Sequence, residues 1–197
     1  ITCRDWSSDV CSSDLKEETL MDLISAGKMS EVKQRFSNSD QINQKNSQGQ
    51  SLLHIAALRN DAEMVQFLLA LGADTEIRDA AGDTPLSAAI TADCFDSVKV
   101  LAGAGSNIYS RNSVGVSVAE LARRKGPDGL ASIITAKTVI QQDSEGKTLL
   151  HHAVDMLDTA AVAQILAAGG NLAMIDKAGD TPLSLAYKKP AESASAK

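Results

Sequence analysis

The sequence predicts an all-α solenoid, a row of similar helix-turn-helix units stacked along one axis. A glycine recurs at spacings of 33, 33, 31 and 33 residues, at Gly49, Gly82, Gly115, Gly146 and Gly179. Two residues after each glycine begins a similar apolar segment, as at residues 51–56 and 84–89, and a second apolar stretch follows, as at residues 64–69. A fixed period near 33 residues is the signature of stacked structural repeats.

Residues 1–15 stand outside this period. In one reading frame, the run from Asp5 to Leu15 resembles the translation of a widely used sequencing adapter, which indicates a non-native segment. A natural N-terminal segment is the alternative. We therefore expect a repeat domain over residues 16–188, with about five and a half units, and a disordered or truncated tail over residues 189–197.

The first unit is found by extending the period backwards. Leu20 and Leu23 precede Leu53 and Ala56 by 33 residues, so residues 19–46 are predicted to form an N-terminal capping unit. Its second helix is expected over residues 31–36, with charged and polar side chains outward, because a terminal unit needs one solvated face.

Helix starts in the middle units carry capping chemistry. Thr84 before Pro85 suits an N-cap, because its hydroxyl can accept a backbone N–H and proline at the next position loses no helical hydrogen bond. Ser117 and Glu120 have the spacing of a capping box.

The turn between the two helices carries residues that tolerate a left-handed backbone, namely Gly27, Asn60, Asp93 and Gly126. Leu157 occupies the fifth such position and does not suit it. If that turn keeps the geometry of its counterparts, Leu157 has a positive φ.

The fourth and sixth units are irregular. The fourth is two residues short, and its second helix opens with the run 126–129, which contains two glycines. This run indicates either a functional hinge or drift in a weakly constrained repeat. In the sixth, a first helix is expected from Pro182 to Lys188, and Pro190 with a polar tail replaces the second helix. Either the stack ends on a half-unit or the coding sequence was shortened.

Over roughly residues 18–187 the pattern resembles the ankyrin repeat. The matching motifs are segments such as Thr84-Pro85-Leu86 at helix starts and Leu71-Gly72-Ala73-Asp74 after the second helix. The resemblance implies a right-handed stack of helix pairs with short hairpin tips along one edge. It also implies a binding surface for proteins, without catalysis.

Composition excludes several classes of function. The net charge is −6, and the chain lacks the basic field of a general nucleic-acid binder. No apolar run approaches the length that spans a membrane. Outside residues 1–15 the one thiol is Cys94, which favours a reducing, cytoplasmic compartment. We expect a monomer.

Few residues suggest chemistry. His54 and His151 share one position in the period, where the ankyrin pattern has a structural histidine, so hydrogen bonding within and between repeats is favoured over metal binding. His152 points elsewhere on its helix, and no ligand set is completed at useful spacing. Cys94 begins a second helix and is expected to be a partly packed residue. We predict no cofactor, no metal and no catalytic residue.

By the resemblance, the hairpin tips and the exposed sides of the first helices line one concave groove. The predicted partner-binding residues there are Arg59, Arg78, Asp83, Arg111, Arg124, Lys125, Glu145, Lys147 and Asp155. The middle of this list is basic, which favours an acidic peptide or protein surface. Ordinary solvated surface is the alternative.

The sequence therefore predicts a non-catalytic module that binds a protein or peptide partner. A second hypothesis is that the chain is the targeting fragment of a longer enzyme or secreted effector.

Overall fold

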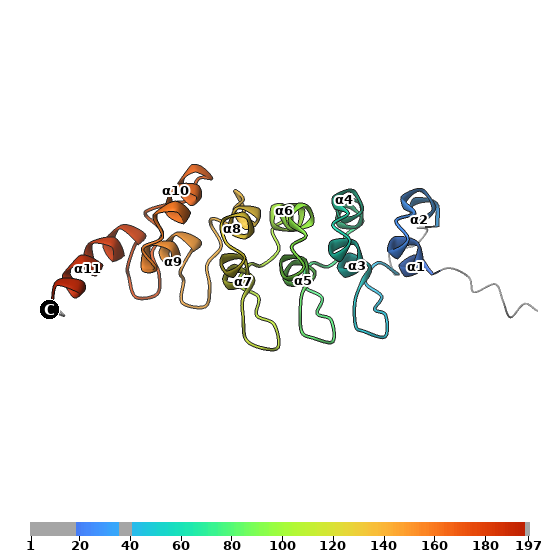
Figure 1. Cartoon of the computed structure of the whole chain (residues 1–197), viewed down its shortest axis with the longest axis horizontal. Coiled ribbons are helices and arrows are strands. Elements are labelled where there is room, and N and C mark those ends of the chain that lie inside the picture. Colours follow the sequence, from blue (N-terminus) through green and yellow to red (C-terminus); the bar gives the residue numbers. More distant parts are fainter. Residues whose placement is uncertain (1–18, 36–40, 196–197) are drawn as a thin grey trace, which may run out of the picture.

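The computed structural model describes residues 19–35 and 41–195. Within them the chain forms the predicted all-α solenoid, with helices in pairs along one axis and loops projecting to one side (Figure 1). The helices are α1 (Leu20–Ser25), α2 (Met29–Arg35), α3 (Leu52–Leu58), α4 (Ala62–Ala70), α5 (Pro85–Thr91), α6 (Phe95–Ala104), α7 (Val118–Arg124), α8 (Pro127–Ile133), α9 (Leu149–Asp155), α10 (Thr159–Ala167) and α11 (Pro182–Ser195). Residues 1–15 and Phe36, which were part of the predictions above, lie outside the described residues.

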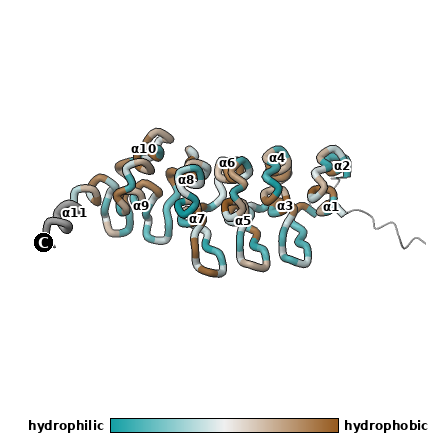
Figure 2. The backbone as a smooth tube through the Cα atoms, viewed as in Figure 1, coloured by the Kyte–Doolittle hydropathy of each residue, from teal (hydrophilic) through white to brown (hydrophobic). Residues whose placement is uncertain are grey.

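The odd-numbered helices are the first helices of the units, and the even-numbered ones lie above them in Figure 1. First helices pack on the next first helix, as α3 does on α5, and second helices do the same, as α4 does on α6, but α7 and α9 scarcely meet. Leu68 and Leu101, at the same position of α4 and α6, are fully buried between units. Figure 2 shows hydrophobic segments recurring in every helix pair, whereas the loop before α3 is largely hydrophilic.

The helix starts follow the predicted chemistry with one difference. The Thr84 hydroxyl accepts the backbone N–H of Ser87, and Pro85 opens α5. The Ser117 hydroxyl accepts the backbone N–H of Glu120. The Glu120 side chain does not return to the cap, however, because it pairs with two arginines further along α7.

The turns between paired helices share one backbone geometry. Asn60, Asp93 and Leu157 have φ values of 55°, 59° and 57°, and Gly27 and Gly126 are also positive. The prediction for Leu157 is confirmed.

The second helix of the fourth unit begins as the sequence indicated, but its glycine has a packing role. A β-carbon on Gly129 would lie 2.5 Å from the carbonyl oxygen of Ala122 and 2.6 Å from the β-carbon of Lys125. Gly129 therefore allows α8 to close onto α7.

Helix α11 continues to Ser195, past the expected end at Lys188 and through part of the expected tail. A proline within a helix removes one intrahelical hydrogen bond and its ring crowds the carbonyl of the preceding turn, whereas the alanines and the glutamate that follow Pro190 favour helix.

Candidate functional site

Five loops project from the helix layers on one side and precede the first helices (Figure 1). We call them the first to fifth tips, at residues 45–51, 78–84, 111–117, 143–148 and 176–181. The tips and the exposed sides of α3, α5, α7 and α9 are called the groove face.

The arginines predicted to bind a partner and Lys125 are exposed, whereas Lys147 is half-buried, and each of these residues also makes contacts within the chain. Arg59, at the end of α3, donates to the carbonyl oxygen of Ser25. The Arg124 Nε donates to Glu120 at 3.1 Å. The Lys125 Nζ lies 2.8 Å from an Asp93 carboxylate oxygen.

Arg78 is a structural link between tips. Its guanidinium donates to the carbonyl oxygen of Gly82 at 2.8 Å, to the carbonyl oxygen of Arg111 and to the Ser110 hydroxyl. Lys45 makes the equivalent bond from the first tip to the Arg78 carbonyl oxygen, at 2.8 Å. Arg111 donates to Gly115 in its own tip, at 2.7 Å.

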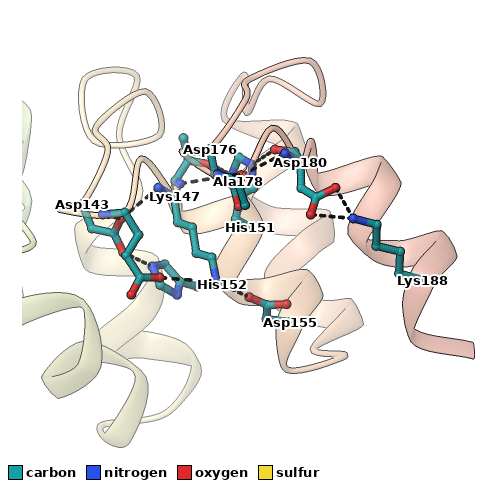
Figure 3. A network of polar contacts seen from close by, with 11 residues as sticks. Asp143, Lys147, His151, His152, Asp155, Asp176, Ala178, Asp180 and Lys188 are labelled. Atoms are coloured by element: carbon teal, nitrogen blue, oxygen red, sulfur yellow. Dashed lines mark hydrogen bonds and ion pairs between the residues drawn. The ribbon is translucent and has the colours of Figure 1, made fainter. Parts of the chain in front are cut away.

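The acidic and basic residues predicted around the fourth tip form a local network (Figure 3). The Lys147 Nζ donates to the Asp155 carboxylate at 3.2 Å and lies 3.6 Å from that of Glu145. The hydrogen bond to Asp155 is the main cause that raises the pKa of Lys147. In the second tip, Asp83 accepts from the Ser87 hydroxyl at 2.8 Å.

His54 and His151 hold neighbouring units together, as predicted. The Nδ1 atom of each ring accepts a backbone N–H at its own helix start, from Ser51 and Thr148, at 3.1 Å. The Nε2–H then donates to the carbonyl oxygen of Asp83 or Asp180 in the next tip, at 3.0 and 3.2 Å. In the described part of the chain, no three His, Cys, Asp or Glu side chains gather to hold a metal ion.

Cys94 is buried at the start of α6. Its thiol donates to the Leu58 carbonyl oxygen at 3.3 Å, and burial raises its pKa. This agrees with a packed residue and not with an activated nucleophile.

The contacts between tips are interrupted between the third and the fourth. A β-carbon on Gly49, Gly82 or Gly146 would lie within 3.0 Å of the backbone of the next tip, whereas one on Gly115 would meet nothing within 4 Å. Within the described residues, no hydrogen bond joins the third tip to the fourth. The chain just before these tips stays joined, because the Gln141 side chain accepts the Ile108 backbone N–H at 3.0 Å.

A pocket of about 420 Å³ opens at this interruption. Its walls come from the third tip and α7 on one side and from the fourth tip and α9 on the other, with α8 and α10 behind. Apolar side chains dominate the walls: Val116, Ala119, Leu130, Leu149, Ala153, Met156, Ala161 and Ile165. The polar lining includes Tyr109, Arg111, Glu120, Arg123, Arg124, Asp143 and His152.

The carboxylates of Glu120 and Asp143 in this pocket are ionised and paired, and a third one, that of Asp158, accepts the Ala161 backbone N–H at 3.0 Å. The hydrogen bond from Arg123 is the main cause that lowers the pKa of Glu120. Burial acts to raise the pKa of Asp143, but hydrogen bonds from the backbone of Lys147 and Glu145 and from His152 outweigh it and leave this pKa below its usual range. The His152 Nε2 lies 2.9 Å from Asp143 Oδ2 (Figure 3).

Sequence reasoning placed Arg111 and Arg124 on this face, but it missed Tyr109, Asp143 and the pocket role of His152. The shortening of the fourth unit was the signal available, since a missing pair of residues disturbs the stacking of one unit on the next.

The described residues contain no helix of sufficient length and apolar character to cross a membrane.

Comparison with known proteins gives the family of the repeats. Residues 20–112 match the family model for ankyrin repeats in three copies. The chain is 38% identical over 134 residues to the E3 ubiquitin-protein ligase KEG of Arabidopsis thaliana, covering 66% of this chain and 8% of that protein. It is 31% identical over 147 residues to the human neurogenic locus notch homolog protein 1, covering 73% of this chain and 6% of that protein. The chain thus spans less than a tenth of the curated relatives it matches.

Among solved structures, a similar chain belongs to the complex of the Bd0816 predatory endopeptidase from Bdellovibrio bacteriovorus with the immunity protein Bd3460. The TM-score is 0.51 and the sequence identity 23%, and the match covers 88% of this chain and 92% of that chain. At this identity the likeness concerns the fold alone.

Proposed function

Because residues 20–112 are ankyrin repeats and the fold is an all-α ankyrin solenoid, we propose that the groove face binds a protein or peptide partner without catalysing a reaction. Ankyrin repeats are typically protein-interaction modules, and this chain is a protein-binding repeat module of that kind.

The observation that carries the proposal is the mixture of side chains on the groove face. Exposed apolar side chains lie there beside arginines, with Val114 80% and Met156 45% exposed. Arginine and methionine are enriched at protein interfaces relative to the rest of the surface. The hydrogen bonds between the first three tips hold the backbone of this face, so a partner meets a surface that is already ordered.

An acidic partner fits this face best. Four arginines of this face use only some of their N–H donors in hydrogen bonds within the chain: Arg59, Arg78, Arg111 and Arg124. A guanidinium has five N–H donors, so these residues can add a carboxylate without losing their present bonds. The remaining predicted contact residues, Lys125, Asp83, Glu145, Lys147 and Asp155, would set the register of the partner by charge.

The test is affinity capture with the immobilised chain, comparing wild type with Arg124→Glu. The variant is expected to lose most of the captured partner while its circular dichroism spectrum stays unchanged. Lys99→Glu is the matched control, because it makes the same kind of charge reversal on the exposed side of α6, away from the groove face. Equal losses in both variants would contradict binding by the groove face.

The length of the relatives favours a second candidate, in which the chain is the recognition part of a larger protein with an activity of its own. The match to the KEG ligase covers 8% of that protein. Recovery of the uninterrupted coding sequence tests this candidate, and a reading frame without any further domain would count against it.

A further inference from the structure

The junction between α7 and α9 departs from the other junctions at a second position besides the tips. Ala119 stands where the other units have Leu53, Leu86 and Leu150, counted from the glycine of each tip. Those three leucines are essentially fully buried between units. Ala119 is three carbons smaller and lines the pocket, so the volume that a leucine fills elsewhere is part of the cavity here.

The next residue of α7 differs from the histidine that two other units have at this position. Glu120 occupies the position of His54 and His151, whose Nε2 atoms bond to the following tip. Glu120 instead turns to Arg123 and Arg124, at 2.8 and 3.1 Å. The histidine bond that closes the α3–α5 and α9–α11 junctions is therefore replaced by ion pairs at the rim of the pocket. The α5–α7 junction has Ser87 at this position, which bonds within its own tip, and the link there comes from Arg78.

The inner wall of the pocket holds a polar group with no partner in the described residues. The Tyr109 hydroxyl oxygen is buried and makes no hydrogen bond, while its ring lies 5.9 Å from that of His152. A buried hydroxyl without a partner costs free energy that a bound acceptor would recover. Burial, with a further contribution from Asp143, raises the pKa of Tyr109, so this hydroxyl stays protonated and is available as a donor.

The charged side chains at the rim of the pocket favour an acidic group on the occupant. Arg111, Arg123 and Arg124 are exposed there. The three carboxylates of the lining, Glu120, Asp143 and Asp158, are less exposed, and each already accepts a hydrogen bond within the chain. The outer edge of an apolar pocket thus presents guanidinium groups, which attract a carboxylate next to the inserted group.

We propose that this pocket is the specificity pocket of the groove face, and that it takes one large apolar side chain of a peptide segment in which an aspartate or glutamate flanks that side chain. The volume of about 420 Å³ lies within the range of ligand-binding pockets and accommodates an aromatic side chain. The Tyr109 hydroxyl donates to a carbonyl oxygen of the segment. This inference rests on the proposed function and adds the chemistry of the partner.

The experiment selects random linear peptides displayed on phage against the whole immobilised chain. Enrichment of a large apolar residue beside Asp or Glu is expected. Selected peptides are then synthesised and titrated by fluorescence anisotropy against wild type and variants.

Ala119→Leu restores the side chain of the other units and fills the pocket. Peptide affinity should fall about 10- to 100-fold, the worth of burying one large apolar side chain. Tyr109→Phe should weaken binding about 2- to 10-fold, as for the loss of one neutral hydrogen bond. Ala163→Leu, at an exposed position of α10, is the control for adding the same side chain and should leave affinity unchanged.

Leu58→Glu, on the groove face in α3, separates the two proposals. If it abolishes binding while Ala119→Leu and Tyr109→Phe do not, the groove face stands and the pocket assignment is overturned. If no peptide is enriched, both are overturned. Binding of free phenylacetate as tightly as the selected peptides would assign the pocket to small molecules and overturn the peptide assignment.

Discussion

Leu157 offers a test of the solenoid geometry at a single residue. Its φ is 57°, and its turn is closed by hydrogen bonds from its own N–H to the Val154 carbonyl oxygen and from the Asp158 N–H to the Ala153 carbonyl oxygen, both at 3.0 Å. The turn at Asn60 has the same pair of bonds. Leucine therefore occupies a left-handed position that its β-carbon makes unfavourable, by about 1 to 2 kcal/mol.

Changing Leu157 to glycine removes this strain and has two costs. Glycine gives the unfolded chain more freedom, which takes back up to about 1 kcal/mol. The lost side chain is 69% exposed, so its remaining burial contributes only about 0.5 kcal/mol. The expected free energy of unfolding for Leu157→Gly is therefore unchanged or slightly higher.

The assay is urea unfolding followed by far-ultraviolet circular dichroism. Ala163→Gly is the matched control, because Ala163 is exposed within α10 of the same unit and glycine there should cost about 1 kcal/mol. A loss above about 1 kcal/mol for Leu157→Gly would show that Leu157 is helical or buried by its side chain, and the register of the units after Gly126 would have to be redrawn.

Three further predictions follow from the same contacts. Leu68→Ala should lower the free energy of unfolding by about 2 to 5 kcal/mol, because Leu68 is fully buried, and a urea-measured loss below about 0.5 kcal/mol would contradict its place in the core. Arg78→Ala should cost about 1 kcal/mol in the same assay and Arg111→Ala close to nothing, since only Arg78 links two tips; equal costs would argue against such a link. Burial lowers the pKa of His54 below its ordinary 6.5, so the unfolded chain takes up the proton more readily, and stability should be complete above about pH 6.5 and decline as the pH falls. His54→Gln should flatten this decline in urea unfolding measured at successive pH values, and an unaltered slope would mean that His54 does not cause it.

Features that repeat with the period were predictable from the sequence. The glycines fix the positions of the tips, and the apolar segments fix both helices of each unit, because one residue position has the same surroundings in every copy. Leu157 is an example, since its positive φ was predicted from equivalent residues 31 and more positions away. The end of α11 was not predictable in this way, because no second helix follows it in the sequence to repeat the pattern.

The exposed arginines show why the candidate site was predicted less well than the fold. The period places Arg78 and Arg111 at equivalent positions, and the sequence therefore treats them alike. Their roles differ because each guanidinium reaches toward the next tip, and only Arg78 finds it within range. A contact between two units depends on the distance between them. This distance cannot be predicted from the residue type at one position of the repeat.

The pocket follows from the same reasoning. The shortened fourth unit was visible in the sequence, but a missing pair of residues can either be absorbed in a loop or shift a tip away from its neighbour. At the groove face the deletion shifts the fourth tip away from the third. Just behind the tips it is absorbed in the loop, because Gln141 still bonds to Ile108. Because the tips separate while Gln141 still joins the chain behind them, the small side chain of Ala119 leaves space that the groove face can reach, whereas leucine fills the same position at the other junctions. Drift and function, the two interpretations that the sequence left open for this unit, thus predict different results for Ala119→Leu. Under drift alone, filling the space should leave partner binding unchanged. Under the specificity-pocket proposal, the same substitution should weaken binding while the fold stays intact.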